Sequence, residues 1–157
     1  FVGPYLPLTD KFAAGSFIRD ALAGGPIRIN GDGTPLRSYL YAADLATWLL
    51  TLLVRGRAST PYNVGSDHAV TLADLAAAIL HSSGNLGPIE IGLPQMNRGA
   101  ARYIPSIERA RSELGLTPRI SLESALLRTV EWARGLANVN SPIHQPDLQF
   151  AVKHKAA

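Results

Sequence analysis

The spacing of apolar residues along the chain changes repeatedly between the helical and the strand period. The first predicted helix has one apolar face, formed by Phe17, Ile18, Ala21 and Leu22. Thr9 or Asp10 can cap its start, because either side chain can accept a hydrogen bond from the free backbone N–H groups there. Residues 24–26, Gly-Gly-Pro, predict its end, since glycine relaxes into the left-handed cap and proline cannot continue a helix.

Short extended segments lie between the helical ones. Residues 27–29 predict a strand, residues 30–33 (Asn-Gly-Asp-Gly) a tight turn, and residues 37–41 a second extended run. Residues 62–65 predict a buried strand that ends in a glycine, and residues 89–91 predict another strand. Because strands alternate with helical patterns, the fold class predicted for the chain is α/β.

Residues 44–55 predict the most apolar helix of the chain, and Gly56 ends it. Its apolar positions at helical spacing are Leu45, Trp48, Leu49, Leu52 and Leu53. Its single polar stripe consists of Asp44, Thr47, Thr51 and Arg55. A helix that is apolar nearly all round belongs inside a protein, so we expect it to be sandwiched against a sheet.

Three further helices follow. Residues 71–74 approximate a capping box and begin a helix whose inward face is Leu72, Leu75, Ala76, Ile79 and Leu80. Ser106 opens a short helix that ends at Leu114. Ser121 opens the last helix, with an inward face of Leu122, Ala125, Leu126, Thr129 and Val130.

The helical pattern fades after Gly135, and beyond it only residues 148–152 still suggest a short strand. We therefore predict a folded domain over residues 1–135 and a partly ordered tail over residues 136–157. At the other end, Phe1 opens the chain in a pattern typical of the end of a buried strand, so we expect the parent protein to be longer.

Composition narrows the class of protein. The 157 residues are 46% hydrophobic and 17% charged, which is typical of one globular domain. No apolar run reaches the roughly 20 residues that a membrane helix needs, and no signal peptide is recognisable, so no membrane partner is expected. The absence of cysteine excludes disulfides and cysteine nucleophiles, and we expect a cytoplasmic protein.

The basic residues point to an anionic ligand. Twelve of the fifteen are arginine, whose planar guanidinium can bind phosphate through two hydrogen bonds. Ordinary surface charge in an arginine-rich proteome would give the same composition. The arginines are dispersed rather than clustered, which argues against a nucleic-acid partner.

Motifs for catalysis are missing. Gly31 and Gly33 begin a dinucleotide-binding pattern, but Leu36 stands where the third glycine is needed and the predicted turn joins two strands. No tyrosine is followed four residues later by lysine, no serine has the flanking glycines of a hydrolase, and the four histidines lack metal-ligand spacing. We therefore predict a domain that holds an anionic substrate while another domain reacts with it.

Several short segments occur in the order and spacing of one known family. They are Gly3-Pro4, Phe17-Ile18, residues 26–33, residues 37–41, Asp44-Leu45-Ala46, residues 62–66, Leu75-Ala76, Glu113-Leu114-Gly115 and Glu131-Trp132. Over roughly residues 1–134 the chain resembles the C-terminal part of extended short-chain dehydrogenase/reductases, the NAD-dependent epimerase/dehydratase family. The dTDP-glucose 4,6-dehydratase branch is the most similar.

The resemblance implies a fold and a function. It implies the last strands of a Rossmann sheet together with a small mixed α/β substrate-binding domain, with the N-terminal Rossmann core absent. The full enzyme would bind NAD and carry its catalytic tyrosine and lysine upstream of this chain. It would act on a nucleoside-diphosphate sugar as an isomerase or a lyase, and the chain alone would bind no cofactor.

The resemblance also implies substrate-binding residues. Arg37 matches the arginine that contacts the substrate diphosphate, although an ion pair with Asp32 or Asp44 would explain it as well. Ile27, Arg28 and Ile29 match the strand that lines the nucleobase pocket, and a plain core strand would have the same sequence.

Two further substrate contacts are implied. Thr71 aligns with a substrate contact, and its capping role explains it equally well. A second diphosphate arginine is expected at Arg98 or Arg102, because the segment lacks the proline and the acid of the usual family motif.

These inferences lead to one prediction and two alternatives. We predict the nucleotide-diphosphate-sugar-binding part of an NAD-dependent sugar epimerase/dehydratase, inactive alone, whose partner is the missing N-terminal Rossmann domain. The first alternative is a stand-alone nucleotide-sugar-binding or interaction module without catalysis. The second is a generic α/β domain that is similar in architecture only. Apolar surface left uncovered would favour a homo-oligomer.

Overall fold

The computed structural model describes residues 1–93 and 101–139 of the chain. Its helices are α1 (Ala13–Leu22), α2 (Ala42–Arg55), α3 (Leu72–Ser83), α4 (Glu108–Leu114) and α5 (Leu122–Val139). Its strands are β1 (Ile27–Ile29), β2 (Leu36–Arg37), β3 (Val70–Thr71), β4 (Ile89–Ile91) and β5 (Arg102–Tyr103). The predicted α/β class is confirmed.

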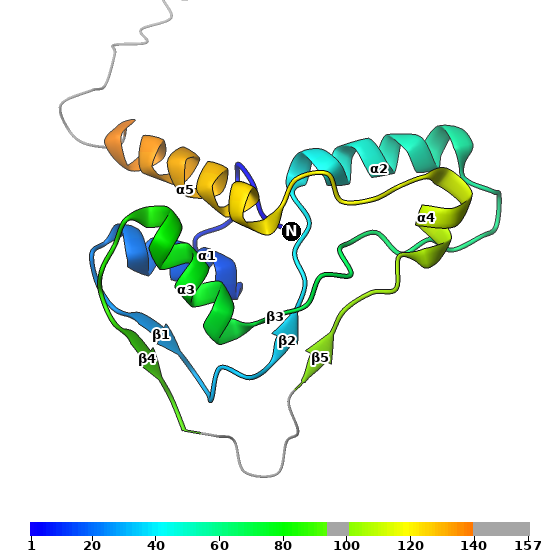
Figure 1. The fold of residues 1–157 in the computed structure, drawn as a ribbon. Coiled ribbons are helices and arrows are strands. Elements are labelled where there is room, and N and C mark those ends of the chain that lie inside the picture. Colours follow the sequence, from blue (N-terminus) through cyan, green and yellow to red (C-terminus); the bar gives the residue numbers. More distant parts are fainter. Residues whose placement is uncertain (94–100, 140–157) are drawn as a thin grey trace, which may run out of the picture.

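The strands form two small sheets (Figure 1). In one, β1 pairs in parallel with β4, and Ile27 lies opposite Ile89. In the other, β2 is central, antiparallel to β3 and parallel to β5. The predicted strands at residues 27–29 and 89–91 are confirmed, whereas the extended run at 37–41 pairs only at Arg37 and, through an isolated bridge to Val2, at Tyr41.

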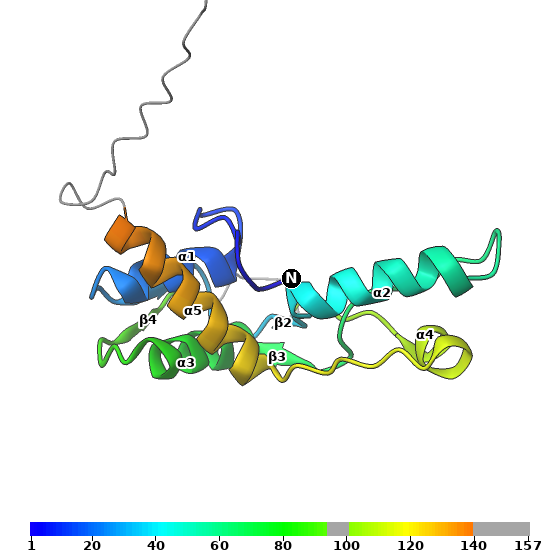
Figure 2. The ribbon, with the colours of Figure 1, turned by 90° about the horizontal axis from the view of Figure 1, so that it is seen from above.

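The larger hydrophobic core lies among α1, α3, α5 and β1 (Figures 1 and 2). The predicted inward faces of these helices are buried here, including Phe17 and Ile18 of α1, Leu75 and Ile79 of α3, and Leu126 of α5. Burying these large side chains supplies the main favourable term for folding, about 1.5–3 kcal/mol for each.

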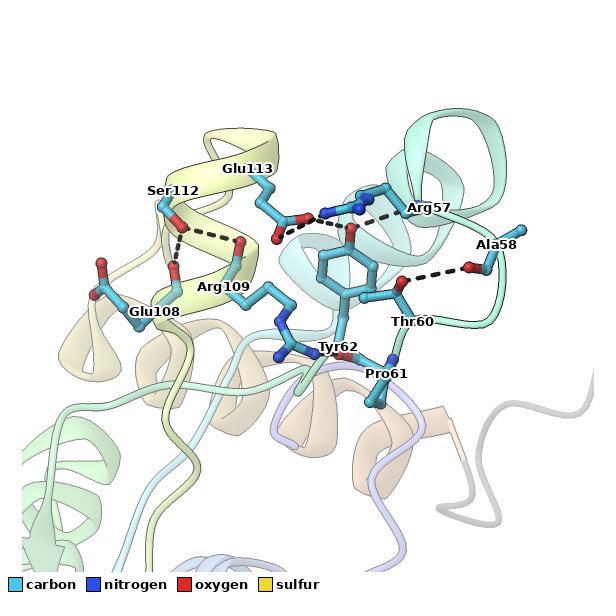
Figure 3. Close-up of polar contacts among 9 residues, drawn as sticks. All are labelled: Arg57, Ala58, Thr60, Pro61, Tyr62, Glu108, Arg109, Ser112 and Glu113. Carbon is cyan, nitrogen blue, oxygen red and sulfur yellow. Dashed lines mark hydrogen bonds and ion pairs between the residues drawn. The ribbon is translucent and has the colours of Figure 1, made fainter.

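A second, smaller cluster lies between α2 and α4, away from the larger core (Figure 2). It consists of Trp48, Ile107, Ala110, Leu114 and Leu116. Polar contacts at its edge tie the 57–62 loop to α4: the Tyr62 hydroxyl donates to Glu113 over 2.6 Å, and Arg109 donates to the Pro61 carbonyl over 2.7 Å (Figure 3). The chain therefore folds around two separate apolar centres.

The helix predicted over residues 44–55 is confirmed, but its burial is not as expected. Only Asp44 and Trp48 of α2 are buried, and a run of apolar side chains faces outward: Leu49, Leu50, Leu53 and Val54, from 52% to 81% exposed. The prediction that a sheet sandwiches this helix is wrong for the described structure, because the two sheets are small and lie elsewhere (Figure 1).

Two local predictions are also wrong. Residues 62–65 form no strand, because no neighbouring strand of the described structure offers backbone groups for pairing. Neither Thr9 nor Asp10 caps α1: the helix begins at Ala13 behind Phe12, which makes no side-chain capping bond.

The observed ends of three helices can also be compared with the predicted ones. The capping box is confirmed at α3, where the Thr71 side chain accepts from the Asp74 N–H over 3.0 Å. Helix α4 begins at Glu108, two residues later than expected. Helix α5 continues through Gly135 to Val139, and the strand suggested at residues 148–152 lies outside the described residues.

Candidate functional site

A cavity of about 720 Å³ opens between the N-terminal loop and the β2 region, a size typical of small-ligand sites. One wall is the N-terminal segment, namely Phe1, Val2, Gly3, Pro4, Tyr5, Leu6, Pro7, Lys11 and Phe12, with Ala13 and Ala14 of α1. The other lining residues are Arg37, Tyr39, Ala42, Leu72 and Tyr103. The site therefore joins residues from five elements, α1, β2, α2, α3 and β5, and from the N-terminal loop.

The start of the chain is fixed to the start of α2. The Val2 N–H donates to the Leu40 carbonyl over 3.1 Å, and the Ala42 N–H donates to the Val2 carbonyl over 2.8 Å. Gly3 follows with φ +148°, and a Cβ on it would lie 2.7 Å from the Cβ of Ala42. Glycine is thus required where the chain leaves this bridge and turns into the loop that walls the cavity.

Arg37 is held by backbone carbonyls rather than by a carboxylate. Its Nη1 donates to the Leu36 carbonyl over 2.8 Å and to the Ala101 carbonyl over 2.9 Å. Neither predicted ion-pair partner holds it: Asp32 accepts from Thr34, and Asp44 accepts from the backbone N–H groups of residues 119 and 120. Within the described residues, the guanidinium charge at the cavity is therefore not neutralised by an acid.

Aromatic rings give the cavity its apolar surface. Phe1, Phe12 and Tyr103 line it and are between 52% and 78% exposed, so their faces are accessible to a ligand. Burial raises the pKa of Tyr39, and the nearby Arg37 charge opposes this only in part. The Tyr39 hydroxyl therefore stays neutral and able to donate a hydrogen bond at physiological pH.

The other residues predicted from the β1 strand lie outside this cavity lining. Ile27 and Ile29 are buried in the larger core, at 0% and 4% exposure. Arg28 points to the neighbouring strand, where its Nε donates to Glu90 over 2.8 Å. A role for these three residues in substrate binding stays a prediction.

The remaining predicted residues lie near the cavity or outside the described structure. Thr71 bonds to Asp74 at the start of α3, while its neighbour Leu72 lines the cavity. Arg102 is exposed on β5 beside the lining residue Tyr103. Arg98 lies outside the described residues, so the choice between the two arginines stays open.

Sequence reasoning missed Lys11, Tyr39 and Tyr103 as candidate site residues. Lys11 is one of only three lysines in the chain and follows the Gly3-Pro4 segment that carries part of the family resemblance. That position in the loop was the only available signal, because nothing in the spacing places residue 11 opposite residue 37.

The glycines of the β1–β2 turn do not form a dinucleotide-binding motif. Gly31 and Gly33 lie in the turn between β1 and β2, and no helix begins there, so the helix N-terminus that binds a pyrophosphate is missing. No group of three or more potential metal ligands is found in residues 1–93 and 101–139. In the same part of the chain, no helix is long and apolar enough to cross a membrane.

Comparison with known proteins supports the resemblance. Residues 1–65 match the sequence model of the NAD dependent epimerase/dehydratase family. A dTDP-glucose 4,6-dehydratase of Streptomyces niveus is 29% identical over 131 residues, which cover 83% of this chain and 39% of that protein. UDP-glucuronic acid decarboxylase 1 of Danio rerio is 29% identical over 156 residues, 99% of this chain and 35% of that protein.

The fold is shared with a solved enzyme. The UDP-glucose 4-epimerase of Thermotoga maritima, crystallised with UDP-glucose, superimposes with a TM-score of 0.76 at 26% identity, over 86% of this chain and 43% of that one. The chain thus spans well under half the length of the proteins it matches. Over residues 1–65 the chain is similar in sequence to the NAD dependent epimerase/dehydratase family, and over most of its length it shares the fold of this epimerase.

Proposed function

We propose that this chain is the nucleoside-diphosphate-sugar-binding part of an NAD-dependent sugar epimerase or dehydratase. The observation that carries the proposal is Arg37: a guanidinium held by two carbonyls on the wall of a 720 Å³ cavity, with no carboxylate of the described structure beside it. A diphosphate is a ligand that such a cation binds well. Lys11 on the loop supplies a second positive charge to the same cavity.

The rest of the lining suits a nucleotide sugar. The exposed faces of Phe1, Phe12 and Tyr103 offer stacking surface to a nucleobase, and Tyr39 offers a hydroxyl. The Thermotoga maritima relative was crystallised with UDP-glucose, which agrees with this ligand class. The predicted contacts of Ile27, Arg28, Ile29, Thr71 and of Arg98 or Arg102 remain part of the proposal.

The redox step belongs to residues outside this chain. NAD would supply hydride transfer in the full-length enzyme, and we expect none to bind here, because the chain lacks both the glycine-rich fingerprint and a tyrosine–lysine pair. The chain's own part would be to bind the diphosphate and to orient the sugar. The cysteine-free composition agrees with a cytoplasmic enzyme.

The partner we propose is an N-terminal Rossmann domain. The matched relatives are more than twice as long as the matched segment, and α2 presents four exposed apolar side chains: Leu49, Leu50, Leu53 and Val54. A continuous apolar helix face of this kind marks an interaction surface. Docking of the Rossmann domain on this face would give α2 the burial that its sequence predicts.

Binding to the chain tests the proposal. Isothermal titration with UDP-glucose and dTDP-glucose should give saturable binding, and Arg37→Ala should weaken it about 10- to 100-fold, because a charged hydrogen bond contributes roughly 1.5–3 kcal/mol. Arg109→Ala is the matched control, since Arg109 also donates to a carbonyl but lies on α4 (Figure 3). Equal affinities for wild type and Arg37→Ala would contradict the proposal.

A different measurement distinguishes the proposed function from the alternative of a stand-alone binding module. The mass of the native protein, detected with an antibody raised against this chain, should be about twice that of the chain or more if a second domain is present. A native protein of the chain's own mass, 16.8 kDa, would favour the stand-alone module. Turnover of a nucleotide sugar by the chain with added NAD would refute the expected inactivity.

A further inference from the structure

The loop from Gly3 to Phe12 forms one whole wall of the cavity and has almost no regular hydrogen bonding of its own. Within it, the Leu6 N–H donates to the Gly3 carbonyl and the Phe12 N–H donates to the Thr9 carbonyl, each over 3.3 Å. Both bonds are near the long limit for N–H···O geometry. The position of this loop must therefore depend on its contacts with the neighbouring helices.

One such contact is made at Gly15 of α1. A Cβ on Gly15 would overlap the carbonyl oxygen of Pro7 and lie 3.4 Å from the Cα of Leu8. Gly15 is buried in a helix and has an ordinary helical backbone, so its lack of a side chain is explained by this close approach and not by a turn. The loop backbone thus rests directly on the backbone of α1.

A second contact is made at Trp132 of α5. The Tyr5 ring lies 5.2 Å from the Trp132 ring between centroids, at 51°, within the range of favourable aromatic pairs. Tyr5 has a positive φ of 65°, which is unfavourable for a residue with a side chain. Tyr5 thus combines this unfavourable backbone conformation with an aromatic contact. Through that contact the loop is attached to α5, which lies far from it in the sequence.

A third contact is the ion pair between Asp10 and Arg19 of α1, at 2.8 Å. The Asp10 side chain is 85% exposed, so this pair contributes little to the position of the loop. Gly15 contacts the loop backbone at Pro7, and Trp132 contacts the ring of Tyr5, which is itself 85% exposed.

We propose that Gly15 and Trp132 are positioning residues of the ligand site: through Pro7 and Tyr5 they fix the loop so that Lys11 and Phe12 face Arg37 across the cavity. The inference rests on the proposed binding of a nucleoside-diphosphate sugar. A diphosphate that contacts Arg37 needs the second cation at a set separation, and a displaced loop removes it. Neither Gly15 nor Trp132 lines the cavity.

The chain offers a matched pair of glycines for the test. Both Gly15 and Gly135 lie inside helices, but a Cβ on Gly135 would meet nothing within 4 Å. Gly15→Ala should weaken UDP-glucose binding about tenfold or more in isothermal titration, whereas Gly135→Ala should leave it within about twofold. Circular dichroism confirms beforehand that both variants are folded.

Trp132 gives a second pair in case Gly15→Ala does not fold. Trp132→Phe keeps an aromatic partner for Tyr5 and should retain binding, whereas Trp132→Ala should lose it about as Gly15→Ala does. A purely structural role for the ring would lower the melting temperature of the Ala variant without changing the affinity of the folded protein. That result would overturn the role of Trp132.

A readout that needs no ligand keeps this inference separate from the proposed function. Trypsin cleaves after Lys11, and mass spectrometry follows that one bond. Cleavage should be faster in Gly15→Ala than in Gly135→Ala, because the loop has left the helix. Equal cleavage rates, or equal affinities for UDP-glucose, overturn the inference. Failure of the wild type to bind, with faster cleavage in Gly15→Ala, would instead refute the proposed function and leave the loop anchored as described.

Discussion

Two charged residues seven positions apart, Arg37 and Asp44, are used differently by the fold. Asp44 is 6% exposed, and its Oδ2 accepts the backbone N–H groups of Arg119 and Ile120, each over 3.0 Å. It therefore fastens the segment before α5 to the start of α2. Among the described residues, the Arg37 side chain is held by two backbone carbonyls, and it lines the cavity. The Asp44 carboxylate is thus bonded inside the protein, whereas the Arg37 guanidinium lines the cavity.

We expect Asp44→Ala to lower the free energy of unfolding by about 2–4 kcal/mol, since it leaves two N–H groups without an acceptor in a buried place. Asp44→Asn should cost less, because its amide oxygen can still accept. Urea denaturation followed by circular dichroism measures both. Thr47→Ala on the exposed side of α2 is the control and should change stability by less than about 0.5 kcal/mol. Equal losses in all three variants would contradict the assignment.

At the scale of elements, α2 is the helix whose sequence and burial disagree most. Its partner in the described structure is α4 with the small cluster around Trp48, which covers one face only (Figure 2). Within residues 1–93 and 101–139, the outward leucines and valine remain 52% to 81% exposed. Such a face stabilises an association when a partner is available and promotes self-association when none is.

We expect the isolated chain to self-associate through this face. The double variant Leu50→Glu with Leu53→Glu should shift the protein toward monomer in sedimentation velocity, because a charge at a buried contact is costly. Leu127→Glu on α5 is the control, since that leucine is also exposed, at 45%, but lies on another helix. An unchanged distribution in the double variant, or an equal shift in the control, would show that another surface is responsible.

At the scale of the molecule, the two apolar clusters divide the chain into a larger and a smaller centre. Trp132 packs at the edge of the larger one, and Trp48 is the largest buried side chain of the smaller one. The smaller centre also depends on a loop fixed by polar contacts such as the Tyr62–Glu113 hydrogen bond (Figure 3). Its few buried side chains give it less stabilisation than the larger centre has.

We expect the two tryptophans to report different unfolding transitions. In single-tryptophan variants made with Trp48→Phe or Trp132→Phe, fluorescence should place the urea midpoint of the Trp48 region below that of the Trp132 region. Ile107→Ala, which removes packing at the smaller centre, should lower the Trp48 midpoint more than the other. Coincident transitions in both variants would instead indicate one cooperative unit.

The sequence by itself determined most local structure and indicated the family resemblance. Periodicity predicted the helices α2, α3 and α5 and the buried faces of α3 and α5. The capping box at Thr71 is confirmed, and the strands at residues 27–29 and 89–91 are where the pattern predicts them. These features depend on neighbours in sequence, through helix and strand periods and through caps. The family resemblance rests on short segments in order, and comparison confirms it.

Tertiary structure alone decided what depends on distant partners. Residues 62–65 have the composition of a strand but no strand beside them, and α2 has the composition of a buried helix but is half covered. The composition of the site also could not be predicted from the sequence, because Lys11, Arg37 and Tyr103 come to line one cavity only after folding. The reason Gly15 must be a glycine is a carbonyl eight residues earlier in the chain. Burial, strand pairing and cavities are properties of surfaces in contact, and a single sequence specifies them only through the complete fold.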